Sequence, residues 1–312
     1  MSFDRLIEKI VKMQNPTVVG LDPKLEYVPE YIRKKAIAKY GKSFKGAAKA
    51  ILAYNKGIID EIYDIVPAIK PQAAYYEMYG WEGVKCLAKT IAYAKEKGMY
   101  VITDGKRNDI GATMTAYTAA HLGFTDIEGD VLQAFGADAL TVNGYLGTDG
   151  ISPLLEVCRE NDKGIFVLVK TSNPSSGELQ DRLLDSGESV YAAMGAMCEK
   201  WGAEAMGKLG YSSVGAVVGA TYPEQLEQMR KALPNTFFLV PGYGAQGGGA
   251  QGVAKAFDEN GLGAMVNSSR AVMLAYKKEE QCDEHDYAKA ARREVIRMKE
   301  DIVSYLPKIS LE

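Results

Sequence analysis

Histidine is scarce in this sequence, which places only His121 and His285 among its 312 residues. His285 lies among charged residues near the end of the sequence, where a surface position is expected. His121 does not directly follow any short apolar run of the kind that predicts a strand. Catalytic triads and metal sites built on histidine are therefore disfavoured.

Closely spaced cysteines and long apolar runs are also missing. The cysteines are far apart and form no CxxC pair, so we expect reduced, buried thiols rather than a zinc site; they are Cys86, Cys158, Cys198 and Cys282. No apolar run approaches the roughly 18 residues of a membrane span. The first residues lack the apolar core of a signal peptide. These absences predict a cytoplasmic protein without a membrane partner.

The composition bounds the size of the core and the choice of partners. The formal net charge is only -3, which gives no reason to expect a nucleic-acid or anionic-membrane partner. Hydrophobic residues make up 47% of the chain, enough for a large core. A chain of this length can form one large α/β domain.

Eight short apolar runs, many of them rich in β-branched residues, alternate with longer amphipathic stretches. Such runs are typical of strands that are buried on both faces. We therefore predict one (β/α)8 barrel domain over residues 1–312, with a doubly wound open sheet as the alternative. The runs are Thr17–Leu21, Val66–Ile69, Met99–Thr103, Ala139–Val142, Ile165–Val169, Val214–Val218, Phe237–Val240 and Ala264–Val266.

The connections between these runs differ in length. Good helix formers fill Gly83–Lys97 before Gly98, which predicts a helix that ends there. Long excursions follow the first and fifth strands, at Lys24–Lys45 and Ser172–Tyr211. Long connections at the C-terminal ends of barrel strands commonly build active-site walls or lids, although Lys24–Lys45 can equally be solvated decoration.

Chemically active residues follow the predicted strands, at the barrel end where active sites form. They mix carboxylates with ammonium groups and show no metal-like cluster. They are Asp22, Lys70, Asp104, Lys106, Asn143, Lys170, Thr171, Ser172 and Arg270.

The third strand ends in the pattern Asp104-x-Lys106-x-x-Asp109. Strand alternation places Asp104 and Lys106 on the same side. A lysine between two carboxylates stays protonated, which suits a proton donor. The alternative is a surface ion-pair cluster of little energetic value.

The last two strands end in groups that can bind phosphate. A glycine-rich loop, Pro241–Gly249, follows the seventh strand and allows backbone N–H groups to approach an anion. Asn267-Ser268-Ser269-Arg270 follows the eighth, where a helix start and a guanidinium can grip phosphate. A flexible turn is the alternative for the glycine loop alone. The pairing of loop and arginine favours phosphate binding.

Taken together, these motifs resemble the orotidine 5'-phosphate decarboxylase family, from about Thr17 to Arg270. The motifs are the DxKxxD element, Lys70 in Ala-Ile-Lys-Pro, Asp22 in Gly-Leu-Asp-Pro, the Pro241–Gly248 loop and Arg270. The two excursions and the stretch Thr141–Gly147 resemble the longer-chain, type 2 branch of that family. The departures from the shorter members after Thr171 leave the pyrimidine contacts open, and Asn143 has no assigned role.

The resemblance implies a role for each matching residue in converting orotidine 5'-monophosphate to uridine 5'-monophosphate. Lys106 would protonate C6 of the pyrimidine, Asp104 would lie beside the departing carboxylate, and Lys70 would bridge Asp104 and the ribose. The substrate-binding residues implied are Asp22 on the ribose, Ser172 on the pyrimidine, Gln246 between phosphate and base, and Gly247 and Arg270 at the phosphate.

The resemblance also implies a homodimer without metal or organic cofactor, in which Asp109 and Thr113 reach the partner's site. Two other functions remain open. One is a related sugar-phosphate aldolase or decarboxylase that uses magnesium, against which Lys70 counts as a poor neighbour for a cation. The other is a catalytically silent protein that binds nucleotide phosphates.

Overall fold

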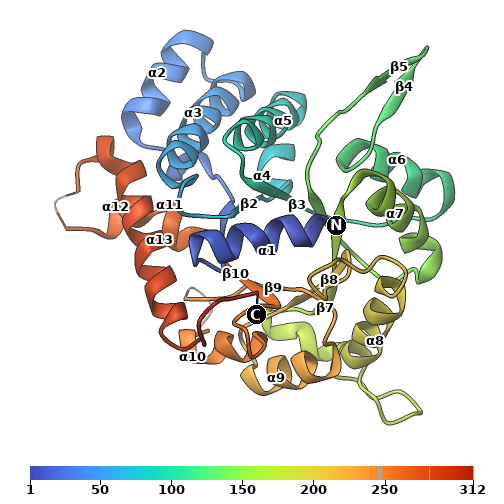
Figure 1. Cartoon of the computed structure of the whole chain (residues 1–312). Helices are drawn as coiled ribbons and strands as arrows, with labels where there is room; N and C mark the ends of the chain where they lie inside the picture. Colours follow the sequence, from blue (N-terminus) through green and yellow to red (C-terminus); the bar gives the residue numbers. More distant parts are fainter. Residues whose placement is uncertain (245–247, 281, 312) are drawn as a thin grey trace.

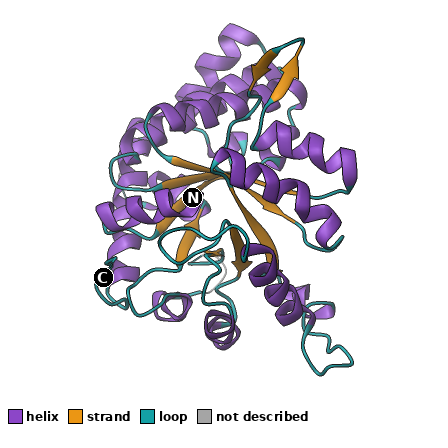
Figure 2. Ribbon diagram, turned by 45° about the vertical axis from the view of Figure 1, so that its right-hand side comes forward, coloured by secondary structure: helices purple, strands orange, loops and turns teal. Residues whose placement is uncertain are grey.

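A computed structural model describes residues 1–244, 248–280 and 282–311. Its centre is a closed barrel of eight parallel strands surrounded by helices (Figures 1 and 2). Each barrel strand lies beside the barrel strand that precedes it in the chain. The strands are β1 (Thr17–Leu21), β2 (Ala68–Pro71), β3 (Tyr100–Arg107), β6 (Ala139–Val142), β7 (Gly164–Lys170), β8 (Val214–Val218), β9 (Phe238–Val240) and β10 (Ala264–Ser268).

Closure of the sheet decides between the two folds that the sequence left open. β1 pairs in parallel with β2 on one side and with β10 on the other, so the first and last strands are neighbours. A doubly wound open sheet would leave its two edge strands unpaired. The predicted (β/α)8 barrel is confirmed, and β1, β6 and β8 have the bounds expected from the sequence.

Helices cover the outside of the barrel and bury the outward faces of the strands (Figure 2). The helix predicted at Gly83–Lys97 is α5, and Gly98 ends it with a φ of +77° that favours glycine. The helices are α1 (Ser2–Met13), α2 (Glu30–Tyr40), α3 (Phe44–Ile62), α4 (Ala74–Glu77), α5 (Gly80–Glu96), α6 (Gly111–His121), α7 (Thr148–Asn161), α8 (Val190–Gly202), α9 (Pro223–Ala232), α10 (Ala250–Val253), α11 (Arg270–Met273), α12 (Ala275–Lys278) and α13 (Tyr287–Val303).

Helix α1 closes the N-terminal end of the barrel, across which it lies in Figure 1. The Phe3 ring is fully buried, with its centroid 4.9 Å from that of Phe166 and 5.6 Å from that of Phe237. Ser2 forms a hydrogen bond with the hydroxyl of Tyr100, the first residue of β3. This packing leaves the C-terminal ends of the strands as the open end of the barrel.

The two predicted excursions contain helices, and a third excursion was missed. Lys24–Lys45 contains α2, and Ser172–Tyr211 contains α8. The missed element is an antiparallel hairpin of β4 (Thr125–Ile127) and β5 (Asp130–Leu132) that projects from the barrel (Figure 1). Its strands are short and exposed, so they lack the apolar pattern that marks the barrel strands. No helix among the described residues has the length and apolar composition needed to cross a membrane.

Candidate active site

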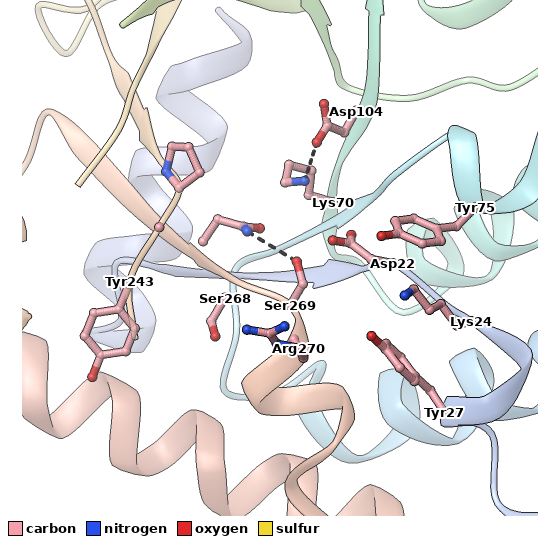
Figure 3. A pocket seen from close by; sticks show the side chains of 13 residues that line it. Asp22, Lys24, Tyr27, Lys70, Tyr75, Asp104, Tyr243, Ser268, Ser269 and Arg270 are labelled. Atoms are coloured by element: carbon pink, nitrogen blue, oxygen red, sulfur yellow. Dashed lines mark hydrogen bonds and ion pairs between the residues drawn. The ribbon is translucent and has the colours of Figure 1, made fainter. Parts of the chain in front are cut away.

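A cavity of about 370 Å³ opens at the C-terminal end of the barrel (Figure 3). Residues from β1, β2, β3, β9 and β10, or from the loops that follow these strands, line it. They are Asp22, Lys24, Tyr27, Lys70, Tyr75, Asp104, Pro241, Gly242, Tyr243, Asn267, Ser268, Ser269 and Arg270. This cavity brings together four of the residues that the sequence predicted: Asp22, Lys70, Asp104 and Arg270.

A second cavity of about 240 Å³ adjoins the first, with which it shares Lys70, Asp104 and Pro241. Apolar side chains of three strands form part of its wall, while Ser172 and Lys106 contribute polar groups. Its other lining residues are Lys106, Thr141, Leu168, Thr171, Ser172, Asn173, Val217 and Leu239. The combined space is polar on the side of Arg270 and partly apolar beyond Asp104.

Lys70, Asp104 and Lys106 form a charged cluster where the two cavities meet. The Lys70 ammonium lies 2.5 Å from Asp104 Oδ2, and the Lys106 ammonium lies 2.6 Å from Asp104 Oδ1. Lys70 and Asp104 are buried, whereas nearly half of the Lys106 side chain is exposed. Both lysines line the second cavity, and Lys106 is the more exposed of the two.

The two lysines determine the charge of Asp104. Burial by itself would raise the pKa of this carboxyl, but the Lys70 and Lys106 ammonium groups outweigh burial and hold the pKa below its ordinary value. Burial would likewise lower the pKa of Lys70, but the carboxylates of Asp104 and Asp22 raise it above its ordinary value. Lys70 and Asp104 are therefore both ionised at neutral pH.

Lys106 reaches Asp104 through an irregular strand end rather than through regular alternation. Its φ is +49°, in the left-handed region, and the register between β3 and β6 shifts between Thr103 and Arg107. The expected placement of Asp104 and Lys106 on one side is correct, but its cause is this bulge. Sequence spacing alone does not reveal such a bulge.

The Asp109 side chain does not lie beside the Lys106 ammonium group of its own chain, contrary to the expectation from their spacing in the sequence. Its Oδ1 accepts a hydrogen bond from the N–H of Ile110, and it forms no ion pair among the described residues. Asp109 lies in the turn between β3 and α6 and is partly exposed, and Thr113 lies exposed in the first turn of α6. Neither residue lines either cavity.

Asp22 presents an unsatisfied acceptor near the first cavity. Its Oδ1 is buried and has no hydrogen-bond partner among the described residues. Burial raises the pKa of this carboxyl, while Lys70 and a hydrogen bond from Ser269 oppose the rise. A ligand hydroxyl that donates to this oxygen would remove the penalty for leaving it unpaired.

Arg270 and the loop after β9 lie at one end of the first cavity. Arg270 is exposed, forms no ion pair with any described residue, and points into the cavity beside Ser268 and Ser269 (Figure 3). Gly242, which also lines the cavity, has a φ of +102° that a residue with a side chain rarely adopts. Gln246 and Gly247, predicted at this end, lie outside the described residues.

The residues after β6 and β7 divide between the site and the scaffold. Ser172 lines the second cavity, as expected. Lys170 does not, because its buried ammonium group turns away to Asp181. Asn143, to which the sequence assigned no role, accepts a hydrogen bond at its Oδ1 from the N–H of Tyr145 and so supports a turn.

Several polar or aromatic lining residues received no individual role from the sequence. The beginning of Lys24–Lys45 is a cavity wall, since Lys24 and Tyr27 contribute to it, whereas α2 lies outside the lining. Tyr75 and Thr141 are further examples, and Asn267 was named only as part of the Asn267–Arg270 motif. Thr141 left a signal in the sequence, because a hydroxyl interrupts the apolar run of β6. Among the described residues, no three His, Cys, Asp or Glu side chains are grouped so that they could hold a metal ion.

Known proteins match this chain over nearly its whole length. The protein named orotidine 5'-phosphate decarboxylase in Rhodopirellula baltica is 45% identical to this chain, over 94% of this chain and 96% of that protein. The protein of the same name in Caldicellulosiruptor bescii is 43% identical, over 88% of this chain and 90% of that protein. The solved structure of OMP decarboxylase from Leishmania donovani is similar with a TM-score of 0.69 and 28% identity, covering 96% of this chain and 98% of the other. A structure from Toxoplasma gondii gives a TM-score of 0.75 at 29% identity, over 96% and 98% of the two chains.

The closed barrel, the charged cluster and the arginine at the far end of the cavity define an α/β-barrel enzyme for a small anionic substrate. Residues 18–284 match the family described as orotidine 5'-phosphate decarboxylase / HUMPS. The chain belongs to this family.

Proposed function

We propose that the protein converts orotidine 5'-monophosphate to uridine 5'-monophosphate and carbon dioxide. The observation that carries this proposal is the Asp104 carboxylate, clamped between the Lys70 and Lys106 ammonium groups at the junction of the two cavities. The relatives named orotidine 5'-phosphate decarboxylase support the same activity.

The polarity of the cavities assigns one part of the substrate to each region. The phosphate binds Arg270 and the loop that contains Gln246 and Gly247, since a guanidinium binds phosphate through two hydrogen bonds. The ribose hydroxyls donate to Asp22 and contact Lys70. The pyrimidine enters the second cavity, where Ser172 contacts the ring between partly apolar walls.

The chemistry requires electrostatic stabilisation rather than an electron sink. Loss of carbon dioxide leaves an electron pair on C6 of the pyrimidine, and the Lys106 ammonium stabilises this charge and then protonates the carbon. Asp104 lies beside the departing carboxylate and forms an ion pair with Lys106. These residues need neither a metal ion nor an organic cofactor for the step.

Two chains share each active site in this proposal, with Asp109 and Thr113 contributed by the partner of a homodimer. Support comes from their position outside both cavities of their own chain. Exposed apolar side chains near α6 and on the hairpin offer a surface for the partner; these are Ile110, Phe124, Ile127, Val131 and Leu132.

We further propose a single domain over residues 1–312, in the longer-chain branch of the family, working in the cytoplasm. The single domain is supported by α1 packing under the barrel and by α13 packing on α3. The branch is supported by the two excursions and by the stretch Thr141–Gly147.

The loss of orotidine 5'-monophosphate absorbance tests the activity, measured with and without EDTA. We expect turnover at the same rate in both conditions. Loss of activity in EDTA with recovery in magnesium would favour the metal-dependent sugar-phosphate enzyme instead. Binding of uridine 5'-monophosphate without turnover of the substrate would favour the silent binding protein.

A further inference from the structure

Thr141 is a buried polar residue in a barrel strand, at the wall of the second cavity. Its exposed fraction is 1%, and the rest of β6 is apolar. A hydroxyl in such a position is unfavourable unless it is fully hydrogen-bonded, so its partners indicate why it is there.

The Thr141 hydroxyl connects the two catalytic residues of β3. Its Oγ1 accepts a hydrogen bond from the backbone N–H of Lys106 at 3.0 Å and donates one to Asp104 Oδ1 at 2.8 Å. These directions are fixed, because an N–H group can only donate and an ionised carboxylate can only accept. From the part of the chain that the structure describes, the Asp104 carboxylate thus receives three donors, of which Thr141 alone is uncharged.

The same hydroxyl holds the irregular backbone at Lys106. A residue other than glycine rarely adopts a φ such as the +49° of Lys106, because this conformation is strained, so surrounding contacts must hold it in place. The bulge also removes Lys106 from the regular register between β3 and β6. The bond from its N–H to Thr141 takes the place of the missing ladder contact.

We propose that Thr141 is a positioning residue for decarboxylation. It fixes the rotamer of Asp104 and the strained backbone of Lys106 together, so that the Lys106 ammonium stays at the carbon that it protonates. This inference rests on the proposed function of the charged cluster. Thr141 acts through these two residues and transfers no proton to the substrate.

The test compares two variants at the same position. Thr141→Val keeps the shape and removes the hydroxyl, whereas Thr141→Ser keeps the hydroxyl. We expect Thr141→Val to lower kcat roughly 10–100-fold with less than about a threefold change in KM, because a small misplacement of a catalytic group affects mainly the chemical step. Thr141→Ser should recover kcat to within about threefold of the unmodified protein by restoring both hydrogen bonds.

The pH profile supplies a readout that a packing defect would not move. Loss of a donor to the ionised Asp104 raises the pKa of this carboxyl. The acid limb of kcat/KM should therefore shift to higher pH in Thr141→Val and stay in place in Thr141→Ser. Thr17→Val is the matched control, because Thr17 is a buried strand threonine at the other end of the barrel whose Oγ1 has no partner among the described residues.

Two outcomes would overturn the proposal. One is a Thr141→Val enzyme with unchanged kcat and pH profile, and the other is a Thr141→Ser enzyme as impaired as Thr141→Val. If Thr141→Val does not fold, Thr141→Cys takes its place, since a thiol is only a weak donor. Absence of turnover in the unmodified protein would contradict the proposed function itself, which separates the two failures.

Discussion

The buried ammonium group of Lys170, at the end of β7, lies 2.7 Å from Asp181 Oδ1 in the excursion that follows this strand. Only 1% of the Lys170 side chain is exposed, against 43% for Asp181. The rings of Tyr191 and Tyr222 also face the ammonium group, with centroids 5.5 Å and 5.0 Å away. The Lys170–Asp181 ion pair therefore holds the excursion Ser172–Tyr211 against the end of β7, close to Ser172.

A double-mutant cycle measures this ion pair. Asp181→Asn leaves a buried charge without its counter-ion, so we expect a coupling energy of about 1.5–3 kcal/mol with Lys170→Met in urea unfolding. The control pair is Arg159 and Glu204, which lie 3.3 Å apart with exposed side chains and should couple by less than about 1 kcal/mol. Equal coupling in both pairs would contradict the anchoring role.

Replacement of Lys106 separates binding from chemistry. Lys106→Ala removes the proton donor and the charge that stabilises the carbanion, so turnover should fall below detection. The phosphate and ribose contacts remain, so uridine 5'-monophosphate should still bind in calorimetry. Lys85→Ala, an exposed lysine of α5, is the control and should keep full turnover. Retained decarboxylation in Lys106→Ala would remove Lys106 from the mechanism.

Replacement of Arg270 should affect phosphorylated ligands selectively. Arg270→Ala loses charge-assisted hydrogen bonds worth roughly 1.5–3 kcal/mol each, so binding of uridine 5'-monophosphate should weaken by about tenfold or more. Binding of uridine, which lacks the phosphate, should hardly change. Equal losses for both ligands would show that Arg270 does not hold the phosphate.

Mixing two inactive variants tests the shared active site. In a dimer of one Lys106→Ala chain and one Asp109→Ala chain, one site keeps its own Lys106 and receives Asp109 from the partner. Confirmed mixed dimers should therefore recover activity, whereas each variant alone should have almost none. No recovery would show that Asp109 does not act across the interface.

The stability of the fold should depend on pH through His121. Burial, with a smaller contribution from Arg107, lowers the pKa of this imidazole to about 4 from an ordinary value of 6.5. Above pH 6.5 the histidine is neutral in both the folded and the unfolded state, so its effect on the free energy of unfolding does not change with pH. As the pH falls from 6.5 to about 4, His121 is protonated in the unfolded chain but not in the folded one. The free energy of unfolding therefore falls by about 3 kcal/mol in total, at roughly 1.4 kcal/mol per pH unit.

Urea unfolding at several pH values checks the effect of His121. His121→Gln should lose less stability than the unmodified protein over this window, and the difference isolates the histidine from the carboxylates that also titrate. His285→Gln is the control, because His285 is exposed. A steep loss that persists in His121→Gln would assign the pH dependence to other groups.

The sequence predicts the barrel well because each barrel strand is buried on both faces. Runs such as Ala139–Val142 stand out against their polar flanks, and both observed bounds of β6 match. The β4–β5 hairpin has no buried residue, so composition gives no sign of it. Its turn depends on the left-handed backbone of Glu128 and Gly129, a local conformation rather than an apolar pattern.

The site was predictable where it follows strand ends and unpredictable where it depends on register. Asp22, Lys70 and Asp104 each end or follow a strand, and parallel strands bring such residues to one end of a barrel. The contact of Thr141 with Asp104 depends instead on how β6 lies against β3 and on the bulge at Lys106. Pairing between distant segments leaves no trace in local spacing.

The packing of Phe3 at the N-terminal end of the barrel also limits how ligands enter and leave the active site. Because α1 fills the N-terminal end, substrate and product enter and leave through the same opening at the C-terminal end of the barrel. Uridine 5'-monophosphate keeps the phosphate and ribose by which the substrate is held, and it must leave before the next molecule enters. The enzyme should therefore be inhibited competitively by its own product, and product release can be the rate-limiting step of turnover.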